Sequence, residues 1–331
     1  MSQSGYARSP FQEGFAALRE EPLLLPAELA WRWSFALAAW LLVLAAGALF
    51  LDTLKVSALD RFFLGTLQPA LESLALGHIF RGALLRAIWI KFIVLAGLTV
   101  MWAFAAAVGR AASLRNLVSL FGGEDRDETA GWQFGPMFQL HLLRAMWTWT
   151  ALGCFVGSFL LGAMMQHQQR SLRAAFFYVF GVALSVVFGV MLNWIFGLAP
   201  LFCIRNQASA REAVLITLDF CTRQGGRLFG LSLAFLALRI VWAGSMFFLV
   251  LAPTGMGKHV GVGWVLLAMS FLLLIYLAGA DALCLARLGA YTALVELDAR
   301  PVPEPEPAPE PAPGLASPAF PIEETAGIQP A

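Results

Sequence analysis

The sequence is poor in charged residues, which is the first indication of where the protein lies. Charged residues make up 13% of the chain and hydrophobic residues 59%, whereas soluble domains carry roughly 25% charged residues. This deficit argues against a soluble domain and favours a membrane protein. The formal net charge of +1 provides no global attraction to nucleic acid, so we expect no nucleic-acid partner.

Cysteines, metal-ligand clusters and catalytic motifs are also scarce. The four cysteines form no Cys-x-x-Cys pair, and the four histidines lie in different segments without metal-ligand spacing. No Gly-x-Ser-x-Gly element or phosphate loop occurs. We therefore expect no disulfide framework, no metal and no cofactor, and we predict that the protein is not an enzyme.

Long apolar runs are what the chain has instead. Six of them can cross a hydrocarbon core of about 30 Å, at residues 31–51, 87–109, 138–163, 173–198, 228–252 and 262–285. The run that begins near Trp31 is too long for a secretory signal. Between the first two runs, Leu59–Phe80 contains charged residues and is predicted to form a surface helix with a turn near Pro69. The predicted fold is an all-α polytopic membrane bundle of about six transmembrane helices with cytoplasmic amphipathic connector helices.

Domain organisation and orientation follow from the same pattern. Residues 1–30 are predicted to form an N-terminal interfacial segment, residues 31–300 a six-span membrane domain, and residues 301–331 a disordered tail rich in Pro and Glu. Lys and Arg flank the spans mainly on the side that carries both ends of the chain. The excess of positive charge predicts a multi-pass inner-membrane protein with both termini in the cytoplasm.

One connector has clear helix signals. Ser209 and Glu212 have the spacing of a capping box, which satisfies backbone donors at a helix start. Pro200 is expected to end or kink the preceding helix, and Gly225-Gly226 to stop the connector helix. This short, polar helix is predicted to lie in the plane of the lipid headgroups.

The same order of elements recurs earlier in the chain. Ala-Ser-x-Arg-x-x-Val occurs at 112–118 and 208–214, Gly-Gly at 122–123 and 225–226, and Leu-Arg-x-x-Trp at 143–147 and 238–242. These matches suggest parallel repeats over residues 87–163 and 173–252, each with a cytoplasmic connector. The alternative is two hydrophobic hairpins that are merely similar in composition.

The second connector also resembles a known family. Pro200, Asn206 and the following SAREAVLITLDFCTRQGGRLFGL resemble the repeated element of bacterial multi-span proteins related to the membrane domain of glycerophosphoryl diester phosphodiesterases. In that element a membrane helix leads through a Pro-containing segment into an amphipathic helix and then into the next span. The resemblance implies the fold only, because the chain lacks a phosphodiesterase domain to carry catalytic residues.

Charged and polar residues inside the spans are the main candidates for a site. Arg239 lies near the middle of the fifth span, where a charge costs roughly 2.5 to 3.5 kcal/mol. We predict that it pairs with Asp281 of the sixth span, either to fix helix register or to line a substrate or lipid cavity; the other possibility is that Arg239 extends to the interface. Three further residues are candidates for polar interhelical contacts: Arg144, His141 and Asn193. Glu28 is a possible partner of Arg144.

The predicted function follows from the basic residues expected on the cytoplasmic face. Basic residues near the connectors are expected to contact anionic headgroups, each contact contributing about 1 kcal/mol: Arg110, Arg115, Arg205, Arg211 and Arg227. We predict a non-catalytic protein that binds membrane lipids or, through its C-terminal tail, a cytoplasmic protein. The alternative is a transporter or permease of small amphipathic molecules with a site near Arg239 and Asp281.

Overall fold

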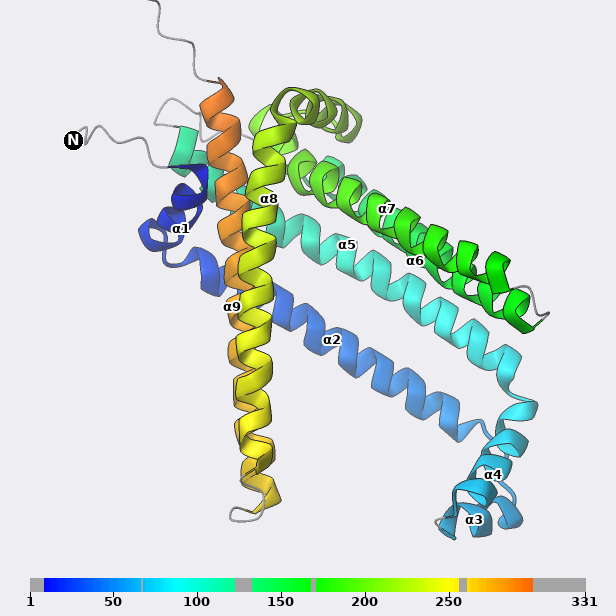
Figure 1. Cartoon of the computed structure of the whole chain (residues 1–331). Helices are drawn as coiled ribbons and strands as arrows, with labels where there is room; N and C mark the ends of the chain where they lie inside the picture. Colours follow the sequence, from blue (N-terminus) through cyan, green and yellow to red (C-terminus); the bar gives the residue numbers. More distant parts are fainter. Residues whose placement is uncertain (1–8, 67, 123–132, 168–170, 256–260, 300–331) are drawn as a thin grey trace, which may run out of the picture.

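The computed structural model describes residues 9–66, 68–122, 133–167, 171–255 and 261–299, which form nine helices and no strand (Figure 1). The bounds are α1 Pro10–Glu20, α2 Leu24–Asp52, α3 Ala58–Gly65, α4 Pro69–Arg81, α5 Leu84–Gly122, α6 Phe134–His167, α7 Ser171–Arg205, α8 Ala210–Gly255 and α9 Val262–Ala299. The predicted all-α fold is confirmed. The predicted tail, 301–331, lies outside the described residues.

Six of these helices are long and apolar enough to cross a membrane: α2, α5, α6, α7, α8 and α9. The chain is therefore an integral, multi-pass membrane protein, as the six apolar runs predicted. The short helices α3 and α4 form a hairpin between the first two spans, which agrees with the surface helix and turn predicted for residues 59–80.

The six long helices meet at one end and diverge toward the other, where α6 stays beside α7 and α8 stays beside α9 (Figure 1). At the first end, which we call the polar end, lie the last residues of α5, α7 and α9: Gly122, Arg205 and Ala299. At the opposite, splayed end, α2 finishes at Asp52 and α9 starts at Val262. Helix α1 and the end of α9 both lie at the polar end, so both ends of the described chain are on the same side of the bundle.

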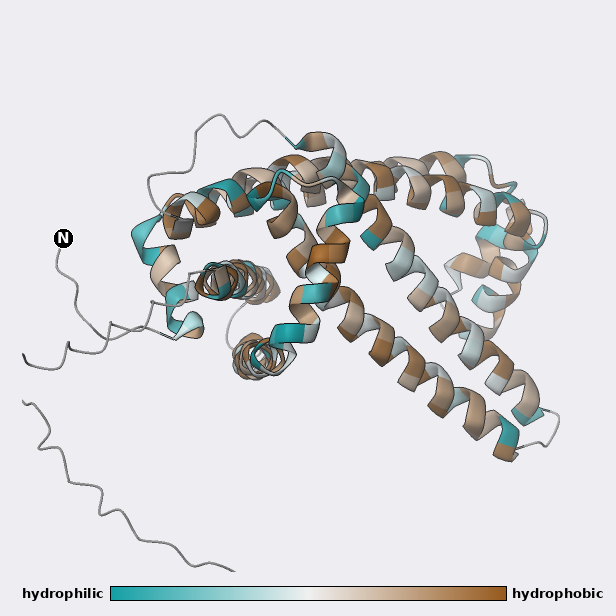
Figure 2. Cartoon of the chain, turned by 90° about the horizontal axis from the view of Figure 1, so that it is seen from above, coloured by the Kyte–Doolittle hydropathy of each residue, from teal (hydrophilic) through white to brown (hydrophobic). Residues whose placement is uncertain are grey.

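The packed core lies at the polar end and not along the spans. Its buried side chains come from the ends of several helices, and include Leu114, Leu140, Leu201, Phe220 and Leu294. Along the most apolar window of each span, by contrast, at most 17% of residues are buried inside the protein. Figure 2 shows these spans as largely hydrophobic along their length. Lipid must cover this surface, because apolar side chains exposed to water would be strongly unfavourable.

Helix α8 contains the predicted connector and the following span in one bent element. The capping box is present: the Ser209 backbone N–H donates to Glu212 Oε2 at 3.0 Å, and the Glu212 N–H donates to Ser209 Oγ at 3.4 Å. Helical geometry is interrupted at Gln224 (φ −110°, ψ 17°), next to the predicted Gly-Gly stop. Gln224 Nε2 donates to Asp298 Oδ1 at 2.6 Å, so the end of α9 holds the bend.

The first connector differs from the second. Helix α5 continues without a break from Leu84 to Gly122, so residues 110–122 extend the span and do not form a separate surface helix. The segment between Gly109 and Gly122 contains no Pro or Gly, and its Ala, Leu and Arg residues favour a continuous helix. Both proposed repeats run from the splayed end to the polar end and back, but their connectors have different conformations.

Of the two outcomes predicted for Pro200, an end or a kink of the helix, the first is wrong. Helix α7 continues through Pro200 to Arg205. Proline is tolerated inside membrane helices because neighbouring helices and local adjustments satisfy the freed backbone groups. The turn comes later, where Gln207 adopts a positive φ of 52° and the Ala208 N–H donates to the Cys203 carbonyl at 3.1 Å.

The N-terminal segment packs on α9 and does not stand apart from the bundle. Helix α1 crosses α9 at Gly14, where a β-carbon would lie 2.2 Å from the Ala286 carbonyl oxygen and 2.9 Å from Ala290 Cβ. Only glycine permits this approach. The first span starts at Leu24, earlier than the predicted residue 31, since Pro26 lies within the first helical turn, where it is tolerated.

The α3–α4 hairpin is held by one carboxylate. Asp60 is buried and accepts from the Ser57 hydroxyl at 2.7 Å and the Ser57 N–H at 3.0 Å. His78 of α4 places its Nδ1 3.1 Å from Asp60 Oδ1. The bonds from Ser57, and then the contact with His78, lower the pKa of Asp60 below its ordinary value.

This lowered pKa predicts a pH dependence for the hairpin. Because the folded state binds the Asp60 proton more weakly than the unfolded state, the stabilisation is complete above the ordinary Asp pKa. It is lost as the pH falls through the lowered value. We expect Asp60→Asn to increase deuterium uptake in residues 58–81 at pH 7, and wild type to approach the variant at the lowest pH. Wild type and variant are compared at the same pH, so the pH dependence of intrinsic amide exchange affects both equally. Equal uptake by the two proteins at pH 7 would refute the role of Asp60.

Candidate functional site

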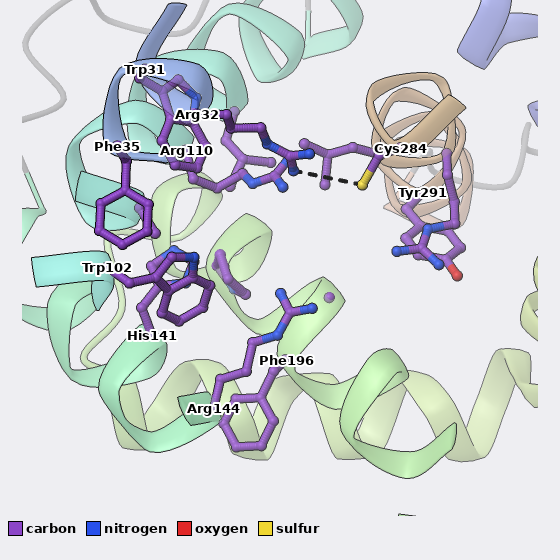
Figure 3. A pocket seen from close by; sticks show the side chains of 16 residues that line it. Trp31, Arg32, Phe35, Trp102, Arg110, His141, Arg144, Phe196, Cys284 and Tyr291 are labelled. Carbon is purple, nitrogen blue, oxygen red and sulfur yellow. Dashed lines mark hydrogen bonds between the residues drawn. The ribbon is translucent and has the colours of Figure 1, made fainter. Parts of the chain in front are cut away.

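A basic cavity lies at the polar end, between the ends of five helices. Its volume is about 360 Å³, and α2, α5, α6, α7 and α9 supply its walls. The lining includes four arginines, Arg32, Arg110, Arg144 and Arg287. Figure 3 shows Arg32 and Arg110 reaching into the same space as Arg144, which approaches from the opposite wall. We call this space the basic cavity.

One wall of the basic cavity is fixed by Glu28, whose side chain is fully buried. Its carboxylate lies 2.9 Å from Arg32 Nε and 3.2 Å from Arg110 Nη1. Ser113 Oγ donates to it at 2.7 Å, and Trp31 Nε1 donates at 3.0 Å. These contacts, the Glu28 network, join α2 to α5. The multiple donors compensate the cost of burying the carboxylate.

Asp281 of α9 holds the other side of Arg32. It forms an ion pair with Arg32 Nη1 and accepts a hydrogen bond from Trp33 Nε1 at 3.2 Å. Arg32 Nη2 also lies 3.7 Å from Cys284 Sγ, the bond drawn in Figure 3. Arg32 therefore connects α2 both to α9 and, through Glu28, to α5.

Positive charge exceeds negative charge around the basic cavity. The four arginines face two carboxylates, Glu28 and Asp281, and both carboxylates contact Arg32. Within the described part of the chain, neither Arg144 nor Arg287 has an ion pair. Arg144 lies close enough to Arg110, Arg287 and Arg32 to be repelled by each of them. The cavity thus carries a surplus of about two positive charges that no described carboxylate balances.

His141 adds an unsatisfied polar group to the same wall. Its side chain is only 2% exposed, and neither ring nitrogen has a hydrogen-bond partner. The ring packs edge-on against Trp102, with centroids 5.7 Å apart. Buried polar groups are normally hydrogen-bonded, so an unpartnered imidazole on the wall of a basic cavity points to a ligand that would complete its bonding.

Helix length places the basic cavity at the level of the lipid headgroups. About 20 helical residues cross a hydrocarbon core of about 30 Å. We count this length along each helix from the splayed end. On α2 it reaches Arg32, and on α6 it stops about one turn short of Arg144. On α9 it stops between one and two turns short of Arg287. On α5 it stops less than two turns before Arg110. The four guanidinium groups therefore lie close to the end of the hydrocarbon region.

A second, mainly apolar cavity adjoins the first. It measures about 400 Å³ and lies between α7, α8 and α9. Cys284 and Arg287 line both cavities. The second cavity is deeper in the membrane, because its α7 residues, from Val186 to Trp194, all precede those of the basic cavity, from Phe196 to Pro200. Most of its lining is apolar, but Arg239 also contributes. We call it the apolar cavity.

The predicted Arg239–Asp281 pair is replaced by a different one. Asp281 pairs with Arg32, and among the described residues no carboxylate pairs with Arg239, which lines the apolar cavity. Asp281 faces α2, a helix distant in sequence, so proximity along the chain suggested the wrong partner. Similarly, Glu28 contacts Arg32 and Arg110 and not Arg144.

Arg144 and His141 do lie together in the basic cavity. The side chain of Asn193 lies outside the described residues.

The arginines predicted to contact headgroups divide into three groups. Arg110 belongs to the basic cavity. Arg205 is occupied by Glu296, with Nε 2.8 Å from Oε1, so it is not available for headgroups. Arg115 is half-buried, whereas Arg211 and Arg227 are exposed at the polar end.

Sequence reasoning missed Arg32, Arg287 and Cys284 as members of the site. Arg32 lies four residues after Glu28, the spacing of an ion pair on one helical face. That signal could have identified it. Arg287 and Cys284 carry no such local signal, because they depend on how α9 packs against α2 and α7.

The arrangement is suited to holding an anion. Guanidinium groups bind phosphate and carboxylate oxygens through paired hydrogen bonds. Among the described residues, no group of three or more His, Cys, Asp or Glu side chains could hold a metal ion.

No protein-family model matches the chain, and neither the curated proteins nor the solved structures contain a significant match. The resemblance of the connector to the membrane domain of glycerophosphoryl diester phosphodiesterases therefore stays a prediction.

The Glu28 network predicts a large cost for removing its charge. Glu28→Gln leaves Arg110 without a carboxylate, which should destabilise the protein by about 3 kcal/mol. Adding Arg110→Gln should recover part of the loss, because the uncompensated charge is then removed. Thermal unfolding in lipid nanodiscs measures both changes, with the exposed Glu21→Gln as the control. Additive effects of the two substitutions would contradict the coupling.

Proposed function

We propose that this chain is a non-catalytic protein of the inner membrane that acts by binding anionic lipids at its polar end. The observation that carries the proposal is the basic cavity, where four arginines face two carboxylates at the level of the headgroups. Cavities of this kind between membrane helices on the cytoplasmic side favour anionic headgroups.

The energetics support an anion as the missing partner. Two guanidinium groups without ion pairs, Arg144 and Arg287, lie near two others in a partly buried space. Like charges repel more strongly there than in water. An entering anion relieves this repulsion and forms charge-assisted hydrogen bonds, which are about twice as strong as neutral ones.

The surface around the cavity adds to the attraction. Arg211 and Arg227 are exposed at the polar end, and each basic residue near an anionic surface contributes about 1 kcal/mol. Because the cytoplasmic leaflet carries most anionic lipid, the proposal includes an orientation with the polar end, and thus both termini, in the cytoplasm. A protein partner bound through residues 301–331 stays a separate prediction.

Lipid co-purification tests the proposal. We expect the wild-type protein, purified in mild detergent, to retain anionic over zwitterionic lipid beyond the ratio in the source membrane. Arg144→Gln should lower this enrichment about tenfold, since it removes one charge-assisted contact, and it leaves the Glu28 network intact. Arg61→Gln, at an exposed arginine of α3 near the splayed end, is the matched control. Lipid extraction with mass spectrometry gives the ratio of anionic to zwitterionic lipid. If the wild-type protein retains these lipids in the same ratio as the source membrane, the proposed function is refuted.

A transporter is the second candidate, and the apolar cavity beside Arg239 favours it. In that case the cavity would admit an amphipathic anion from within the membrane, while Asp281 holds Arg32 in place. Proteoliposomes should then move a fluorescent fatty-acid analogue faster than protein-free liposomes, and Arg239→Gln should abolish the difference. Identical flux with and without protein would exclude this candidate.

A further inference from the structure

We propose that the two cavities together hold one lipid whose headgroup is a phosphate monoester. Its phosphate lies in the basic cavity against Arg144, Arg287 and His141, and one acyl chain lies in the apolar cavity. This inference rests on the proposed function and adds the class of lipid and the position of each of its parts.

The two cavities adjoin along α9. Cys284 and Arg287, one helical turn apart, line both of them. Helix α7 also lines both, with Gly197 and Pro200 in the basic cavity and Val190 and Trp194 in the apolar cavity. In the proposed complex, the acyl chain passes between α7 and α9, beside Cys284 and Arg287, from the basic cavity into the apolar cavity.

Polarity changes along this route as it does along a lipid molecule. The basic cavity has four arginines and a histidine at headgroup level. The apolar cavity is lined by aliphatic and aromatic side chains from within the spans, among them Val186, Val190, Leu233, Phe235 and Leu236. Both volumes, about 360 and 400 Å³, fall in the range of small-molecule sites.

The unpaired groups identify phosphate as the headgroup chemistry. Arg32 and Arg110 are already bound by carboxylates, so the groups left for a ligand are Arg144, Arg287 and His141. Two guanidinium groups match the charge of about −1.5 to −2 on a phosphate monoester. The imidazole of His141 can donate one further hydrogen bond to a phosphate oxygen.

Cys284 provides a reporter for occupancy because it lines both cavities. The full chain, with Cys154, Cys203 and Cys221 replaced by Ala, is placed in phosphatidylcholine nanodiscs and treated with a small maleimide. Three probes separate the parts of the ligand. Phosphatidic acid has phosphate and chains, glycerol 3-phosphate has the phosphate alone, and diacylglycerol has the chains alone. We expect phosphatidic acid to slow alkylation about tenfold more than either of the others at equal concentration.

Two substitutions test the two halves separately. Gly189 lines the apolar cavity, and a β-carbon there meets no atom within 4 Å, so Gly189→Leu adds a side chain to this cavity from an unobstructed position. It should weaken protection by phosphatidic acid about tenfold and leave the effect of glycerol 3-phosphate unchanged. Arg144→Gln should weaken both. Gly153→Leu is the matched control, because a β-carbon at this exposed α6 position also meets nothing within 4 Å.

The outcomes distinguish this inference from the proposed function. If anionic lipid is retained and Arg144→Gln weakens protection of Cys284 but Gly189→Leu does not, the apolar cavity holds no chain and only this inference fails. Equal protection by glycerol 3-phosphate and phosphatidic acid would also overturn it, since the apolar cavity would then hold no chain. If the wild type retains no excess of anionic lipid, the proposed function itself fails.

Discussion

The excess of helix length over membrane thickness determines where everything else in this protein lies. About 20 residues cross the hydrocarbon core, yet the six long helices have 29 to 46 residues. Near the splayed end the connections are short: three residues separate His167 of α6 from Ser171 of α7, and six separate Gly255 of α8 from Val262 of α9. The surplus length therefore accumulates at the polar end, where the helix ends extend past the hydrocarbon region.

These extended ends explain why the core is found outside the spans. In lipid, apolar side chains gain little by packing on one another, because the surrounding chains are equally apolar. Past the headgroups the hydrophobic effect acts again, and side chains such as Leu114, Leu201 and Leu294 are buried there. The Glu28 network lies at this boundary and joins α2 to α5. A buried carboxylate is tolerated there because four donors surround it.

The sequence predicted the local elements well and the pairing of distant residues poorly. Apolar runs of at least 20 residues indicate spans whatever their packing, and the Ser209–Glu212 spacing specifies its own helix start. The Arg239–Asp281 pair was assigned because its helices are adjacent in sequence, yet Asp281 meets Arg32, 249 positions away. The packing of all the helix ends determines which face of α9 contacts α2. No local sequence pattern predicts this contact.

The four arginines differ in what they contribute to stability, and this difference separates those that hold the fold from those that the proposed lipid would contact. Arg32 and Arg110 bind Glu28, and their removal would expose a buried carboxylate to an apolar surrounding. Arg144 and Arg287 bind no described carboxylate and repel their neighbours, so the empty protein would be more stable with neutral residues in their place. Binding of an anion converts this repulsion into attraction and stabilises the loaded protein by mass action. A surplus of charge that weakens the empty protein is thus what a site for an anionic lipid requires.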